Sequence, residues 1–210
     1  MIKLQLLLGS ASYGLTTENS DIDICIVGSG VHPIPNYNKV DVFHQSKEDF
    51  VQDILLERKK HPLLLQRLFP AEIMLDTEAS KYIIDTRESV IKAQLKKIYE
   101  VHMKIGNIFT KNIDRTYHLF PKRLAYGIMF FDTMYRYAQG IPFAEAIRPE
   151  EDFRQWLLDV RNGTIDLEEI KSVCEEKKEK AESVSSFYDC DVNQDYLDTW
   201  KSYVLSLLSE

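Results

Sequence analysis

The sequence predicts an α+β fold in which a small mixed β-sheet carrying helices is followed by a C-terminal helical bundle. Within the first 45 residues, short apolar runs alternate with loops of glycine, proline and polar residues, a pattern typical of strands. From about residue 88 onward, apolar residues instead recur every three or four positions, which is typical of amphipathic helices. We therefore expect two domains, a sheet-containing core over residues 1–88 and a helical domain over residues 89–210.

Three apolar runs predict the strands of the sheet. Residues 2–8 are mostly apolar and lead into a glycine. Residues 22–27 and 39–43 are rich in isoleucine and valine, and the loop between them contains two prolines, a residue type that central strands exclude. We expect these two segments to pair as neighbouring strands. One more short strand is expected over residues 73–75.

Helices are expected in the rest of the chain. A long helix carries one apolar stripe from Ile91 to Phe109, and His102 lies on that stripe. The next helix ends at Gly140, a residue type that often follows a helix C-terminus. The run from Glu168 to Glu182 alternates acids and lysines, which favours a solvated surface helix. Further helices are expected over residues 47–59, 62–69, 149–162 and 191–208.

A glycine-serine turn and three aspartates lie in or beside the expected strands. Gly9-Ser10 follows the first strand, and such a turn lets backbone N–H groups and a hydroxyl approach phosphate oxygens. Asp21 and Asp23 are two positions apart, so on a strand they point to the same face, and Asp41 lies between two valines on the next strand. Three neighbouring carboxylates repel one another unless divalent cations neutralise them. The pattern predicts a two-metal site beside a phosphate-binding turn, with a triphosphate as the ligand.

This order of motifs resembles the DNA polymerase beta-like nucleotidyltransferase superfamily, and in particular small predicted nucleotidyltransferases of bacteria and phages. The resemblance rests on Gly9 and Ser10, on Asp21 and Asp23, and on Asp41. It implies a minimal nucleotidyltransferase sheet followed by helices. It also implies that the turn holds the β and γ phosphates of a nucleoside triphosphate (NTP), that Asp21 and Asp23 bind two Mg²⁺ or Mn²⁺ ions, and that Asp41 binds the metal that activates an acceptor hydroxyl.

Lys122 and Arg123 are further candidates for binding the nucleotide phosphates, because a triphosphate needs more positive charge than the metals supply. The resemblance also places a basic pair here, at the start of an expected helix. An exposed Lys-Arg pair is common on ordinary surfaces as well, so both interpretations stay open. His102 is similarly open between a residue satisfied in a helix interface and one near the nucleotide.

The amino-acid composition excludes some kinds of binding partner. With 26 Lys and Arg against 33 Asp and Glu the net charge is −7, so broad non-specific binding of nucleic acid is not expected, although a small or structured RNA acceptor is compatible with it. The three cysteines and five histidines form no zinc-binding spacing. We find no signal peptide and no apolar segment of ~20 residues, so we expect a cytoplasmic protein without membrane contact.

The function predicted is metal-dependent transfer of a nucleoside monophosphate from an NTP to a hydroxyl acceptor, with release of pyrophosphate. The acceptor stays open among an RNA end, a protein side chain and a small molecule, because the superfamily supports all three. The acidic composition slightly favours the last two. The alternative is a non-catalytic protein that uses the same fold to bind nucleotide or to neutralise a partner.

Overall fold

The computed structural model describes residues 2–8, 15, 22–28, 40–58, 64–69, 72–73 and 75–209. Two compact units are present: a sheet unit formed by Met1–Gln94 together with Val192–Glu210, and a helical unit formed by Leu95–Asp191. The chain therefore leaves the sheet unit once and returns to it. The domain boundary expected between residues 88 and 89 stays a prediction. The mixed sheet with helices, followed by a mostly helical part, confirms the expected fold class.

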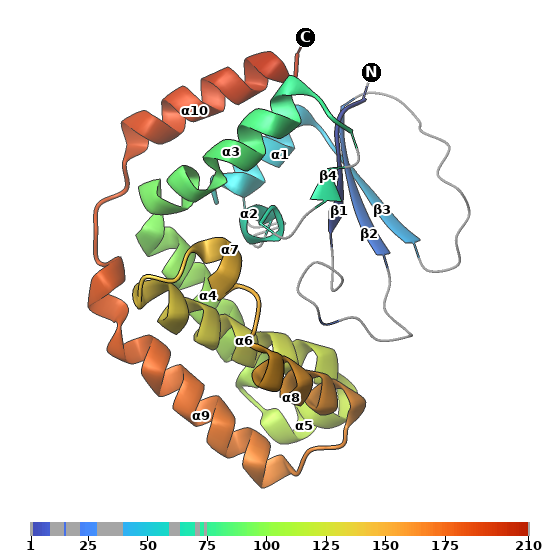
Figure 1. Cartoon of the computed structure of the whole chain (residues 1–210), viewed down its shortest axis with the longest axis vertical. Coiled ribbons are helices and arrows are strands. Elements are labelled where there is room, and N and C mark those ends of the chain that lie inside the picture. The colour runs from blue at the N-terminus through green and yellow to red at the C-terminus, as the bar shows by residue number, and fades with distance from the viewer. Residues whose placement is uncertain are drawn as a thin grey trace. The chain divides into compact units, whose positions relative to one another are not determined.

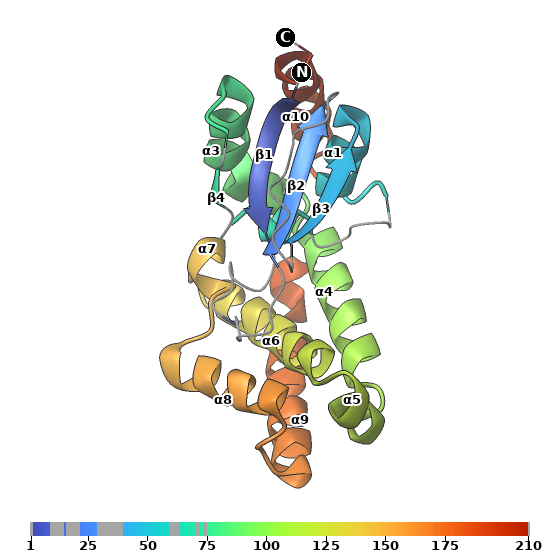
Figure 2. The same cartoon turned by 90° about the vertical axis from the view of Figure 1, so that its right-hand side faces the viewer.

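The sheet unit is built on four strands in the order β3-β2-β1-β4 (Figures 1 and 2). Strand β1 (Ile2–Leu8) is antiparallel to both β2 (Ile22–Gly28) and β4 (Glu72–Ile73), whereas β2 is parallel to β3 (Val40–Gln45). The four consecutive residues from Ile24 to Val27 are all buried. A strand buried on both faces reads as a continuous apolar run, which explains the sequence of β2 after its first two residues.

Helices α1 (Lys47–Ile54) and α3 (Glu78–Ala93) pack on the sheet, and α10 (Gln194–Leu207) packs on both of them (Figure 1). The indole of Trp200 in α10 is buried and donates a 2.8 Å hydrogen bond to Thr86 Oγ1 in α3. The backbone N–H of Asn193 donates to the carbonyl of Ala93 at 2.9 Å. These contacts fix the returning helix to the first unit. The short helix α2 (Leu64–Arg67) also belongs to this unit.

The helical unit centres on α4 (Leu95–Thr110) and α6 (Pro121–Ala138), which lie in close contact. A Cβ atom at Gly106 would lie 2.5 Å from the ring of Phe131, and one at Gly127 would lie 2.9 Å from Phe109 Cβ. Both glycines are therefore needed for this close approach. Around the pair lie α5 (Ile113–Leu119), α7 (Phe143–Ala146), α8 (Glu151–Asn162), α9 (Leu167–Ser183) and the 3-10 helix η2 (Ser185–Tyr188).

The expectation of one long helix from Ile91 to Phe109 was wrong. The helix breaks at Gln94, whose φ of −134° and ψ of 35° are not helical. The Gln94 side chain is buried, and its amide donates a 3.0 Å hydrogen bond to the carbonyl of Ile54 at the end of α1. This tertiary contact competes with helix continuation at a position where the apolar stripe shows no interruption.

Two helices end at the glycines that the sequence predicts. Gly163 ends α8 in the left-handed conformation, with φ of 74°, and Gly140 follows α6 with φ of 87°. The first helix is shorter than expected, because it ends at Ile54 and Leu56 then adopts a φ of 56°. Among the described residues, no helix has the length and apolar character needed to cross a membrane.

Candidate functional site

Asp23 and Asp41 are register partners on the parallel strands β2 and β3. Asp23 is the second residue of its strand and Asp41 the second residue of the next, so both lie at the same edge of the sheet. Neighbouring strands are about 4.8 Å apart, and paired positions share one face of a sheet. The backbone thus brings two of the three predicted aspartates side by side. Asp23 is half-buried.

The other predicted residues of this site adjoin the same edge in the sequence. Asp21 precedes β2 by one residue, and Gly9 and Ser10 directly follow β1, whose last residue, Leu8, pairs with Asp23. Asp21, Gly9 and Ser10 themselves lie outside the described residues. Within the described part of the chain, no group of three metal-binding side chains is found, and the predicted third ligand, Asp21, falls outside that part.

A chain of buried polar contacts joins β2 and β3 to α1. The amide of Gln45, at the end of β3, donates a 2.6 Å hydrogen bond to Asp53 Oδ2 in α1, and the Cys25 thiol of β2 donates to Gln45 Oε1 at 3.6 Å. Arg58 completes the chain, because its Nε lies 3.5 Å from Asp53 Oδ1 and it also pairs with Asp49. The hydrogen bond that Arg58 donates to Asp49 raises the pKa of Arg58. We call this set the Gln45–Asp53 chain. It joins β2, β3 and α1, and so helps to fix the register of the two aspartates.

Carboxylate oxygens are the donors that Mg²⁺ and Mn²⁺ prefer in proteins. Two aspartates at one strand edge, with a third acid one residue before β2, supply such a donor set. Two such carboxylates also favour a bound cation electrostatically, since their mutual repulsion is relieved by it. The residues present at this edge therefore fit a divalent metal site.

Lys122 and Arg123 lie in the first turn of α6, in the helical unit, whereas the aspartates lie in the sheet unit. Both side chains are exposed, and the Arg123 guanidinium lies over the Phe120 ring at 4.8 Å from its centroid. Their predicted binding of nucleotide phosphate stays a prediction.

His102 is a core residue of the helical unit. Its Nδ1 lies 2.8 Å from the carbonyl of Ile98, one turn earlier in α4, and its ring meets Phe130 and Phe143 edge to face. The side chain is 2 % exposed, and burial lowers its pKa to about 4. The histidine is therefore neutral at pH 7. These contacts favour the interpretation of His102 as a packing residue.

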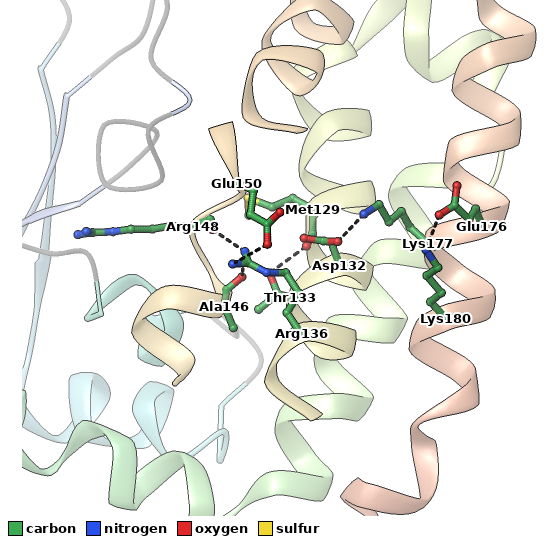
Figure 3. A network of polar contacts seen from close by, with 10 residues as sticks. All are labelled: Met129, Asp132, Thr133, Arg136, Ala146, Arg148, Glu150, Glu176, Lys177 and Lys180. Carbon is green, nitrogen blue, oxygen red and sulfur yellow. Dashed lines mark hydrogen bonds and ion pairs between the residues drawn. The ribbon is translucent and has the colours of Figure 1, made fainter. Parts of the chain in front are cut away.

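A polar network that the sequence analysis missed joins α6 to α9 and to the segment before α8 (Figure 3). The ammonium of Lys177 lies 2.6 Å from the nearly buried carboxylate of Asp132 and 4.2 Å from the centroid of the Phe153 ring. Arg136 donates to the backbone carbonyls of Ala146 and Arg148 at 3.2 and 2.6 Å. The sequence does contain a signal for this network, namely Asp132. An acid within the apolar run of α6 needs a partner when it is buried.

The same network corrects the interpretation of residues 168–182 as a wholly solvated helix. Lys180 and Glu176 do form an i,i+4 pair at 2.5 Å, as expected for such a helix. Lys177 departs from the pattern, because only 20 % of its side chain is exposed and it neutralises a buried acid. In Figure 3 the Arg148 side chain extends away from the other residues drawn, so its backbone carbonyl rather than its charge takes part in the network.

The fold and the paired aspartates near the start of β2 and β3 together define a class of protein. It is a mixed-sheet domain whose paired aspartates can hold divalent metal. Residues 4–106 match the nucleotidyltransferase domain family, and the chain thus carries a polymerase beta-like nucleotidyltransferase domain. Members of this family are typically enzymes, and the domain implies binding of an NTP. The matched segment begins within β1, includes β2 to β4 and ends within α4. No curated protein matches the chain significantly in sequence.

Proposed function

We propose that the protein is a metal-dependent nucleotidyltransferase that transfers a nucleoside monophosphate from an NTP to a hydroxyl acceptor. The observation that carries the proposal is the register of β2 and β3, which pairs Asp23 with Asp41 within a nucleotidyltransferase domain. Two-metal nucleotidyl transfer needs acids that lie side by side, and this register supplies two of them. The expected cytoplasmic location stays a prediction.

The proposed residue roles follow from the positions along the sheet edge. Gly9 and Ser10 bind the β and γ phosphates through backbone N–H groups and a hydroxyl. Asp21 and Asp23 would hold two divalent ions, and Asp41 would hold the ion that activates the acceptor hydroxyl. When bound, the ions stabilise the attacking and the leaving oxygen together. Lys122 and Arg123 contribute further positive charge to phosphate binding.

In the proposed reaction, the acceptor oxygen attacks the α phosphorus in line with the bond to the β phosphate. A new oxygen–phosphorus bond forms, the α–β phosphoanhydride bond breaks, and the electron pair of that bond leaves with pyrophosphate. The acceptor hydroxyl gives up its proton to water. Asp41 would hold a divalent cation, which would make the acceptor hydroxyl easier to deprotonate.

The test is pyrophosphate release from each of the four NTPs with Mg²⁺ or Mn²⁺, in the presence of a cell extract that supplies acceptors. The double variant Asp23→Asn/Asp41→Asn should lose about 10³-fold in rate, because losing metal ligands removes several kcal/mol of transition-state stabilisation. The matched control is Glu48→Gln, which removes an exposed acid from α1 in the same unit and should keep the wild-type rate.

Circular dichroism should show that the double variant is folded, so that loss of activity reports on chemistry. Equal rates in the wild type and the double variant would contradict the proposal. So would stoichiometric nucleotide binding with no pyrophosphate released under any condition, which would instead indicate the non-catalytic alternative. Nucleotide labelled at the α phosphate would then identify the acceptor as RNA, protein or small molecule.

A further inference from the structure

The helical unit carries an exposed surface that is both basic and apolar between the end of α4 and the start of α6; Figure 2 shows the course of the backbone in this region. It lies on α5 and on the residues that flank this helix. We call it the α5 surface, and it consists of Lys111, Arg115, Leu119, Phe120, Lys122 and Arg123, all of them exposed. Leu119 is 57 % exposed and Phe120 is 46 % exposed, so neither side chain is explained by core packing.

The cations of the α5 surface are not neutralised locally. Among the described residues, no carboxylate lies within 4.0 Å of a side-chain nitrogen of Lys111, Arg115, Lys122 or Arg123. All four lysines of the neighbouring helix α9 do have such a partner, as Lys180 does in Glu176. The α5 surface is thus a local concentration of positive charge on a chain whose net charge is −7.

The acids nearest to α5 are already engaged. Asp114, the only acid between residues 111 and 123, lies 3.2 Å from Lys171 Nζ, which also lies 2.7 Å from Glu168. These two hydrogen bonds raise the pKa of Lys171. Asp166 accepts hydrogen bonds from the first turn of α9. Asp114 and Glu168 thus share Lys171, and Asp166 caps α9. The cations of the α5 surface therefore stay available to an external anion.

Phe120 gives the surface a feature that simple anion binding does not require. Its ring is half exposed, and the Arg123 guanidinium lies 4.8 Å from its centroid. A planar guanidinium next to an exposed aromatic ring provides two flat surfaces on which a nucleobase can stack. Cations that contact phosphates, together with an aromatic side chain that stacks on bases, are the combination by which proteins bind single strands of nucleic acid.

We infer that the α5 surface binds a single-stranded segment of an RNA, and that this RNA is the acceptor. The second half of this inference rests on the proposed function, because an RNA end supplies the hydroxyl that the reaction needs. Four cations contact only a few phosphates, so the surface suits a short strand and agrees with the absence of broad nucleic-acid binding expected from the net charge. The phosphate role predicted for Lys122 and Arg123 is thereby extended from one triphosphate to neighbouring phosphodiesters.

The binding test uses fluorescence anisotropy of a labelled 12-nucleotide single-stranded RNA with the whole protein. For a single strand, the logarithm of affinity falls with the logarithm of salt concentration with a slope of roughly −0.7 per phosphate contacted, so four contacts predict about −3. The variant Lys122→Glu/Arg123→Glu should bind at least about tenfold more weakly and with a slope nearer −1.4. The control variant Lys81→Glu/Lys92→Glu carries the same charge change on exposed lysines of α3 and should bind as the wild type does.

Phe120→Ala separates stacking from charge. Loss of one stacked base costs ~1–3 kcal/mol, so affinity should fall about tenfold while the salt slope stays at the wild-type value. Comparable binding of a DNA strand of the same sequence supports the inference, because the surface contacts phosphates and bases. Equal losses in the α3 control, an unchanged affinity in the α5 variants, or equally tight binding of polyglutamate or of phosphatidylserine vesicles would overturn it.

The two proposals fail in distinguishable ways. The variant Asp23→Asn/Asp41→Asn should bind the RNA as the wild type does, because its substitutions lie in the sheet unit. Pyrophosphate release without RNA binding would leave the transferase with another acceptor and would overturn the inference. RNA binding without pyrophosphate release would contradict the proposed function and leave the α5 surface as an RNA-binding site.

Discussion

The two compact units of this protein are stabilised in different ways. The sheet unit holds its two neighbouring aspartates in register over the buried polar Gln45–Asp53 chain. The helical unit has an aromatic core around α4 and α6, in which His102 is a buried titratable group beside Phe130. A buried polar chain therefore joins β2 and β3 to α1 in one unit, whereas close apolar packing brings α4 and α6 together in the other.

This difference has a practical use, because each unit contains one tryptophan. Trp200 lies in the sheet unit and Trp156 in the helical unit, and the chain has two tryptophans in all. In a Trp156→Phe background, fluorescence reports unfolding of the sheet unit, and in a Trp200→Phe background it reports unfolding of the helical unit. Three variants test whether the free energy of unfolding of each unit changes as the contacts in its interior predict.

The largest effect is expected from Phe131→Ala in the helical unit. Phe131 is fully buried against Gly106, at the closest approach of α4 and α6. Removal of a buried phenyl ring leaves a cavity and costs about 4 kcal/mol in the free energy of unfolding. Urea unfolding followed through Trp156 measures this loss. Phe187→Ala, at a ring that is 46 % exposed, is the matched control and should cost less than about 1 kcal/mol. Similar losses in both variants would show that the α4–α6 contact is not tightly packed.

The second effect is expected from Asp53→Ala in the sheet unit. The Asp53 carboxylate is fully buried, and its loss leaves the amide of Gln45 without its 2.6 Å partner and Arg58 without one of its two acids. Breaking such a buried polar contact costs about 3 kcal/mol. Urea unfolding followed through Trp200 measures it. Asp53→Asn keeps an acceptor for Gln45 and should cost distinctly less; if both variants are equally unstable, the charge rather than the hydrogen bond holds β3 to α1.

The smallest expected effect is a pH dependence of the stability of the helical unit, which contains His102. Burial lowers the pKa of His102 from 6.5 to about 4, so the unfolded chain binds a proton here more readily than the folded one. The stability contributed by the neutral histidine is complete above pH 6.5 and is lost as the pH falls toward 4. At pH 5 the loss amounts to about 2 kcal/mol.

The measurement compares urea unfolding of the helical unit at pH 7 and pH 5 for the wild type and for His102→Asn. The variant should lack the part of the pH dependence that comes from His102. His118→Asn, at an exposed histidine of α5, should retain the wild-type dependence. Identical pH profiles for wild type and His102→Asn would show that another group is responsible.

Much of the sheet unit could be predicted from sequence, because its strands are short and their pattern is local. The acid between two valines at position 41 placed Asp41 on a strand beside that of Asp23, and the observed register pairs the two residues. Side chains alternate between the two faces of β2, as expected for a strand, but their burial does not alternate. Cys25 and Val27 are as buried as Ile24 and Ile26, so side chains on both faces of this central strand are covered.

The features missed by the sequence analysis depend on contacts between distant residues. The break at Gln94 requires the carbonyl of Ile54, which lies 40 residues earlier in the chain. Lys177 resembles its exposed neighbours in sequence and differs from them only through Asp132, 45 residues away. The α5 surface is a third case, because cations and apolar residues at irregular spacing show no periodic pattern until the fold exposes them together.

The return of α10 to the sheet unit has a consequence for synthesis of the protein on the ribosome. The helical unit is one continuous stretch of chain, so all of its residues have emerged before the residues of α10 do. The sheet unit, although its strands are translated first, must wait with the surfaces of α1 and α3 uncovered until the helix that packs on them arrives. Contacts this far apart in sequence close slowly, so the nascent sheet unit is the natural client for a chaperone.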